Sequence, residues 1–246
     1  MATHGMAAQA LSPDDSVLCR VGGVAAIILG LLYLAVTALY AIAGAVPSGT
    51  GEVWLAYFDG KDAAWWGIAA LSVVTDVLFL PLAAALYVAL RRVNRNATLA
   101  GVTLLVLFVI LDLAVTWPNY ASLITLSGDL AAATTEAQRA AIMAAATYPA
   151  SVLDSSLFGV YAILVPALGV LGIGLVMLGG SFSRSAAWVG VLTGILGILS
   201  VAGPFAWDPL GALAIPTSVL TTVWVFIVGY KLIRIAGRDG SGRPSP

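Results

Sequence analysis

Charged side chains are scarce in this sequence. Lys, Arg, Asp and Glu make up 9% of the 246 residues, whereas a soluble domain carries about 25%. Hydrophobic residues make up 61%, and they gather in long runs and not in an amphipathic pattern. Runs of this length indicate an all-α polytopic membrane protein and exclude a large soluble core.

Cysteine and histidine are almost absent. The single Cys19 cannot form an internal disulfide, and the single His4 stands in the polar N-terminal segment. A His/Cys metal cluster and haem ligation by histidine are therefore not expected, and we predict no cofactor and no metal centre. The net charge of -1 argues against nucleic acid as a partner.

Six runs are long enough to cross a bilayer, which takes about 20 predominantly apolar residues. They predict a six-transmembrane-helix bundle over residues 18–236, between disordered tails at 1–17 and 237–246. The expected spans are residues 21–46, 64–90, 97–117, 152–178, 186–205 and 210–235. Between the third and fourth spans we expect an external loop, residues 119–150, in which Thr135 and Gln138 form a capping-box pattern for a short interfacial helix.

The basic residues set the expected orientation. If the N-terminus is cytoplasmic, all of the 11 lysines and arginines except Lys61 and Arg139 fall on the cytoplasmic side. Positive charge is enriched in cytoplasmic loops, so both termini are predicted to be cytoplasmic.

Asp76 is the most unusual residue, because it interrupts the second span in "SVVTDVLFLP", residues 72–81. It stands about 20 Å from Arg91 at a rise of about 1.5 Å per residue. A charged aspartate at mid-helix costs about 2.5–3.5 kcal/mol on insertion scales, and protonating it at pH 7 costs about 4 kcal/mol. We therefore expect a hydrogen-bonded carboxyl group, paired with Ser72 one turn back or with a neighbouring helix.

Further polar residues follow helical spacing in the next two spans. Asp112, Thr116 and Asn119 lie at i, i+4 and i+7 near the outer end of the third span, and Asp154 and Tyr161 lie at i and i+7 at the start of the fourth. Each set therefore shares a helix face. With Asp76 near the midplane, these residues sketch a path from the outside to the centre; whether they converge in space stays open.

These residues allow two interpretations. Intramembrane acids commonly mark proton or cation pathways, or a pocket for a cation or a small polar ligand. Alternatively, Asp76 and Asp112 form interhelical hydrogen bonds that hold the bundle together, and Asp154 caps its helix or pairs with Arg139 or Lys61.

Three classes of function follow. We expect first a structural or interaction component of the membrane, then a proton- or cation-linked small-molecule transporter, and last an intramembrane enzyme. The sequence has no serine paired with a His or Lys base at membrane depth and no phosphate loop or HExxH motif. Beside the lipid bilayer, a second copy of the chain is one candidate partner, because the glycine face of Gly190, Gly194 and Gly197 allows close helix approach, either within this chain or between copies.

The layout of the chain resembles the bacterial membrane-protein family "domain of unknown function 4386". The resemblance rests on three stretches: "RVGGVAAIILGLLYL", "LGIGLVMLGGSFSRSAAWVGVLTGILGIL" with its short Arg184 loop, and "IPTSVLTTVWVFIVGYKLIR". Members often have a Pro-Arg-Trp-Leu-like turn before the fifth span, where this chain has residues 183–188, "SRSAAW". The resemblance implies a multi-pass protein of the bacterial inner (cytoplasmic) membrane without an established activity, and it assigns no catalytic residue.

Overall fold

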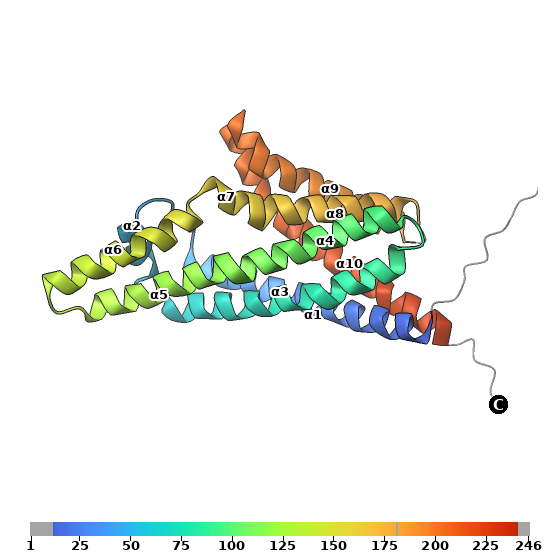
Figure 1. Ribbon diagram of the computed structural model, residues 1–246, viewed down its shortest axis with the longest axis horizontal. Helices are drawn as coiled ribbons and strands as arrows, with labels where there is room; N and C mark the ends of the chain where they lie inside the picture. Colours follow the sequence, from blue (N-terminus) through green and yellow to red (C-terminus); the bar gives the residue numbers. More distant parts are fainter. Residues whose placement is uncertain (1–11, 181, 241–246) are drawn as a thin grey trace, which may run out of the picture.

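The computed structural model describes residues 12–180 and 182–240. Within these ranges the regular structure is entirely helical (Figure 1). The α-helices are α1 (Pro13–Ala43), α2 (Gly51–Phe58), α3 (Asp62–Leu90), α4 (Arg95–Leu111), α5 (Trp117–Ala132), α6 (Glu136–Leu153), α7 (Ser156–Gly159), α8 (Val165–Leu178), α9 (Arg184–Ala202) and α10 (Ala214–Gly240). Two π-helical turns, Asp112–Thr116 and Val160–Leu164, join α4 to α5 and α7 to α8, and 3-10 turns at Gly203–Phe205 and Asp208–Leu213 lie between α9 and α10.

Six helical segments of the described chain are long and apolar enough to cross a membrane. Their mean hydropathies lie between 1.9 and 2.5. They are α1, α3, the continuous rod Arg95–Ala132, and the segments Ser156–Leu178, Arg184–Phe205 and Asp208–Gly237. The predicted fold, an all-α six-span membrane bundle, is confirmed.

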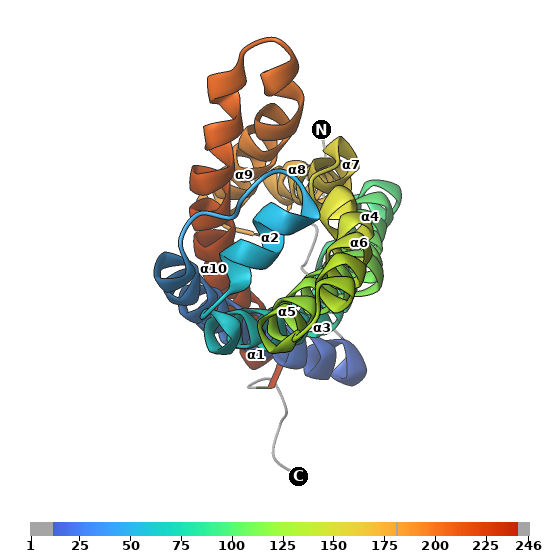
Figure 2. The same cartoon turned by 90° about the vertical axis from the view of Figure 1, so that its left-hand side faces the viewer.

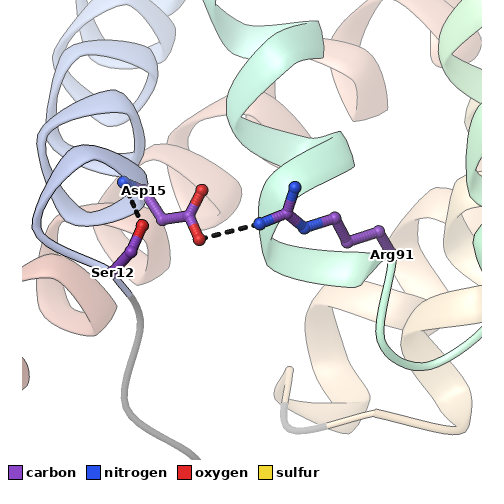
Figure 3. A network of polar contacts seen from close by, with 3 residues as sticks. All are labelled: Ser12, Asp15 and Arg91. Atoms are coloured by element: carbon purple, nitrogen blue, oxygen red, sulfur yellow. Dashed lines mark hydrogen bonds and ion pairs between the residues drawn. The ribbon is translucent and has the colours of Figure 1, made fainter.

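The spans pack in a ring in which each one contacts two main neighbours, in the order α1, α3, α4, α8, α9, α10 and back to α1. α1 lies along α3 and α10, while α8 lies along α9 and α4. Glycine allows the closest approach: a Cβ on Gly22 of α1 would stand 2.6 Å from the Pro81 carbonyl oxygen of α3. The end of this pair that carries the α1 N-terminus also has an ion pair, since the Arg91 guanidinium donates to the Asp15 carboxylate at 2.8 Å, and Ser12 caps α1 by accepting a hydrogen bond from the Asp15 amide (Figure 3).

The glycine face of α9 is covered within the chain. A Cβ on Gly194 would stand 2.5 Å from the Leu171 Cβ of α8, and one on Gly190 would stand 2.7 Å from the Trp224 indole nitrogen of α10. These glycines therefore serve the close packing of α9 inside one copy. The expected association of two copies through the same face stays a prediction.

The rod formed by α4, its π turn and α5 reaches beyond a bilayer. It has 38 residues, which at about 1.5 Å per residue is roughly 57 Å, against about 30 Å of hydrocarbon. Its α5 end packs against α6 and α2. Seen from this end, α2 lies near the middle of the view, in front of the longer helices (Figure 2).

The external loop predicted for residues 119–150 is wrong. The third span does not stop at Trp117; the helix continues to Ala132, and α6 adds 18 more helical residues, so the region is a helical hairpin. Pro118 suggested a stop because proline lacks an amide hydrogen. It is tolerated because the π turn before it already displaces the hydrogen-bond register. The capping box at Thr135 and Gln138 is present and begins α6.

Other boundaries differ by a few residues. α1 begins at Pro13, inside the expected tail, because Ser12 accepts a hydrogen bond from the Asp15 amide, and it ends at Ala43, where Gly44 has a φ of 82°. The fourth span begins at Ser156 after a turn, and α10 continues to Gly240. The remaining tail residues, 1–11 and 241–246, lie outside the described residues.

Candidate functional site

Asp76 lies halfway along α3 and is 3% exposed. Its Oδ2 accepts a hydrogen bond of 2.9 Å from the Trp117 indole Nε1 at the start of α5. The hydrogen-bond partner of Asp76 is therefore on a neighbouring helix, one of the two predicted alternatives, and it is the indole of Trp117. This bond joins two spans at a depth where a carboxyl group otherwise has no water to bind.

Asp112 lies beside Asp76. It begins the π turn between α4 and α5, is 7% exposed, and its carboxyl group lies close to the Asp76 carboxyl group. Among the described residues, no lysine or arginine forms an ion pair with either carboxyl group. Two buried carboxylates in contact repel each other strongly, so the pair needs a proton or a cation between them.

A π turn brings this pair together. The Trp117 backbone N–H bonds to the Asp112 carbonyl, five residues back, and Pro118 has no N–H to offer. The Leu113 carbonyl is thereby left without its usual helical donor, because the amide of Trp117 is taken and the next residue is proline. The wider turn also places the Trp117 side chain at Asp76, next to Asp112.

A second π turn faces the first. In Val160–Leu164 the Val165 N–H bonds to the Val160 carbonyl, and Pro166 follows just as Pro118 follows the other turn. The two turns are in contact. Such turns in long helices occur frequently at functional sites.

Two hydroxyl groups at this junction are buried without hydrogen bonds. Thr116 is 3% exposed and its Oγ1 has no hydrogen-bond partner; the same is true of the buried Tyr161 hydroxyl from the second turn. The Thr116 hydroxyl lies next to both Asp112 and Tyr161, but without the geometry of a hydrogen bond. Buried polar groups of this kind are uncommon and call for an explanation. We refer to Asp76, Asp112, Thr116 and Tyr161 as the carboxyl–hydroxyl cluster.

Two other residues predicted for the site take part in hydrogen bonds within their own helices. Ser72 is buried on the same face of α3 as Asp76, and its carbonyl accepts the Thr75 hydroxyl at 2.7 Å. The Asn119 side-chain amide donates to the Val115 carbonyl at 2.7 Å. Asn119 thus stabilises the helix directly after Pro118 and is not directed at the carboxyl pair.

Asp154 does not join the cluster. It ends α6 and is exposed, and it accepts a hydrogen bond of 2.7 Å from Ser48. It lines a surface hollow together with residues of the α2 N-terminus and α6: Gly49, Thr50, Gly51, Thr147, Ala150 and Ser151. The structure therefore shows a pair of aspartates at one level and a separate third one, in place of the expected path.

Aromatic side chains fill the space between the cluster and α2. The Trp65 and Tyr120 rings stack with centroids 5.0 Å apart, and Trp54 and Phe58 of α2 pack on them. The indole nitrogens of Trp54 and Trp65 are buried without hydrogen-bond partners. We call these four residues the aromatic layer; Trp117 connects it to the cluster through a ring contact of 5.6 Å with Tyr120.

The first span also faces the site. Tyr33 and Tyr40 of α1 lie close enough to Asp112 for an electrostatic interaction with its carboxyl group. Tyr33 is also close enough to interact with Asp76. α2 is anchored to the end of α1, where the Tyr57 hydroxyl donates to the Gly44 carbonyl at 3.0 Å. Burial raises the pKa of Tyr57, which keeps this donor protonated.

The described residues contain no group of three or more His, Cys, Asp or Glu side chains that could hold a metal ion. Comparison with protein-family models, with curated proteins and with solved structures finds no match. The resemblance to the family of unknown function therefore stays a prediction.

Proposed function

We propose that the protein is an ion-coupled membrane transporter for a small molecule, with Asp76 and Asp112 as its ion site. The observation that carries the proposal is the burial of two neighbouring carboxyl groups, Asp76 on α3 and Asp112 at the first π turn, on either side of the Trp117 indole that donates to Asp76, without an ion pair from the described chain. Intramembrane acids arranged in this way bind and release protons or cations. A pair of carboxyl groups can bind and release an ion when no basic side chain neutralises the pair permanently.

The helix breaks support the same proposal. Both π turns interrupt spanning helices at membrane depth, and both precede a proline. In many secondary transporters, ion and substrate sites lie near the midplane where helices are discontinuous. The aromatic layer and α2 close the outer side of the site in this conformation, and a transporter opens such a layer during its cycle.

Alternating access gives a test that does not need the substrate. Thr116→Cys places a thiol at the cluster, while Cys19, the one native cysteine, is fully buried in α1. In oriented vesicles, a membrane-impermeant thiol reagent is expected to modify Thr116→Cys from either side. Thr193→Cys is the matched control, because Thr193 is 1% exposed and its hydroxyl is bonded to the Val189 carbonyl.

A thiol at position 116 that stays unreactive from both sides, across pH and salt, would contradict transport. Where it reacts, proteoliposomes under an imposed ion gradient give the second measurement. Asp76→Asn is expected to abolish gradient-driven flux of small molecules from a panel. Asp154→Asn is the control, because that carboxyl is exposed and lies apart.

The second candidate is a structural or interaction component of the membrane. The Trp117–Asp76 hydrogen bond favours it, because it ties α3 to α5 as an interhelical polar contact would. In that case the Asp112→Asn variant is expected to fold normally and to have no effect on ion or small-molecule flux. The intramembrane-enzyme class stays a prediction, with the carboxyl pair as its acid and base.

For location, we propose the bacterial cytoplasmic membrane with both termini inside. In support, the start of α1 and the end of α10 lie at the same end of the bundle as the α3–α4 turn (Figure 1). Basic side chains are distributed over these segments and the start of α9: Arg20, Arg91, Arg92, Arg95, Arg184, Lys231 and Arg234. A C-terminal reporter that fluoresces only in the cytoplasm is expected to be bright, and a dark fusion would reverse the orientation.

A further inference from the structure

The carboxyl–hydroxyl cluster offers oxygen donors from three spans at one place. Asp76 comes from α3, Asp112 and Thr116 from the first π turn, and Tyr161 from the second. The indole of Trp117 occupies one oxygen of Asp76, Oδ2. The other carboxyl oxygens and both hydroxyls are the remaining donors.

The two hydroxyls point to a ligand. Thr116 Oγ1 and the Tyr161 hydroxyl are buried, lie side by side next to Asp112, and make no hydrogen bond. A buried hydroxyl without a partner is unfavourable, and the cost disappears when a cation or water takes its lone pair. This observation is independent of the two acids.

The backbone adds a further donor at the same level. Because Trp117 donates to the Asp112 carbonyl and Pro118 has no N–H, the Leu113 carbonyl is released from the helix ladder. Released carbonyls inside a membrane persist where they line a cavity or bind a ligand. In discontinuous transporter helices, carbonyls of this kind coordinate sodium.

The chemistry of the donors selects the ion. Carboxyl, hydroxyl and carbonyl oxygens are hard ligands, which exclude the soft transition metals that prefer sulfur and imidazole. Calcium takes six to eight oxygens, commonly from several carboxylates, whereas two carboxyl groups are present and one is partly engaged by an indole. A monovalent ion needs less negative charge around it.

We propose that Asp76, Asp112, Thr116 and Tyr161 bind one sodium ion between the two π turns. The inference rests on the proposed transport function and names its coupling ion. The Trp117 indole positions Asp76 for this site, and the Leu113 carbonyl is the backbone donor closest to it in sequence.

The test uses the full chain in nanodiscs and radioactive sodium as the probe. The wild type is expected to bind sodium saturably, with potassium and choline competing poorly. Thr116→Val removes one ligand at nearly constant shape and is expected to weaken binding by about tenfold or more. Thr116→Ser keeps the hydroxyl and is expected to restore it, which separates ligand loss from misfolding. Thr193→Val is the buried control on α9, and its binding is expected to equal that of the wild type.

Three results would overturn the inference: no saturable sodium binding by the wild type, equal binding by Thr116→Val and the wild type, or displacement of sodium by micromolar calcium. These outcomes are distinguishable from failure of the proposed function. A Thr116→Cys thiol that reacts from both membrane sides without sodium binding leaves transport standing with another ion. An unreactive thiol together with no sodium binding would contradict both the transport function and the sodium site.

Discussion

Replacing Trp117 by phenylalanine tests the link between α3 and α5. The indole donates to Asp76 Oδ2 at 2.9 Å, and Asp76 is 3% exposed. Hydrogen bonds to charged groups contribute about 1.5–3 kcal/mol in soluble proteins, and interhelical hydrogen bonds in membranes average about 0.6 with a maximum near 1.7 kcal/mol. Because Asp76 is charge-bearing but lies among membrane helices, we expect a loss between these two ranges, about 1–2 kcal/mol.

Phenylalanine also changes the ring contact with Tyr120, which is 5.6 Å between centroids. A double-mutant cycle with Asp76→Ala removes this contribution, because it isolates the energy of the pair. The measurement is reversible unfolding in mixed micelles for the wild type, both single variants and the double variant. We expect a coupling energy of about 1 kcal/mol, stabilising in the wild type.

Trp188→Phe is the matched control. Trp188 is 60% exposed on α9, so its replacement should change the unfolding free energy by less than about 0.5 kcal/mol. A stability loss of the double variant that equals the sum of the losses of the two single variants within about 0.5 kcal/mol would show that Trp117 and Asp76 do not interact. The hydrogen bond, and with it the positioning of Asp76, would then be refuted.

Other parts of the fold give predictions in the same unfolding assay. Gly194→Ala should destabilise the protein by about 1–3 kcal/mol, because its Cβ would stand 2.7 Å from a backbone oxygen of α8. Gly128→Ala should stabilise it by up to about 1 kcal/mol, because a Cβ there meets no atom within 4 Å. If both glycine variants changed the unfolding free energy in the same direction, the packing described would be contradicted. Asp15→Asn should cost at most about 1 kcal/mol, and the cost should vanish at high salt, since its partner Arg91 is 37% exposed. Ser12→Ala should cost about 0.5–2 kcal/mol at any salt concentration, because it removes a cap and not a charge pair.

The bundle could be predicted from the sequence because run length alone selects membrane helices. The hairpin of α5 and α6 could not, since "TWPNY" at residues 116–120 is typical of a helix end. Whether proline stops a helix depends on where the displaced hydrogen bonds go. In this case the Trp117 amide and the Asn119 side chain take backbone carbonyls of the preceding turn, and the helix continues.

The sequence named the four residues of the carboxyl–hydroxyl cluster, but it did not indicate Trp117 and did not predict how these residues are arranged. Regular α-helical spacing groups Asp112 with Thr116 and Asn119, and it places Trp117 on another face. The π turn changes this grouping, so Trp117 reaches Asp76 while Asn119 turns to its own helix. One signal was available: Pro118 and Pro166 each stand two residues after a π turn, at Thr116 and at Leu164. The proline that follows each turn could have indicated two interrupted helices. The sequence pattern did not show that these two helices are neighbours.

The presence of two carboxyl groups separates the two leading functions. A purely structural link between α3 and α5 needs one acceptor and one donor, and Asp76 with Trp117 supplies both. Asp112 beside them adds repulsion, and the unpartnered hydroxyls of Thr116 and Tyr161 add a further cost. An asparagine at either aspartate position would remove the repulsion and keep a hydrogen bond. The cluster is therefore better explained by an occupant that the second carboxyl and the hydroxyls hold, which is why we propose an ion-coupled function ahead of a structural one.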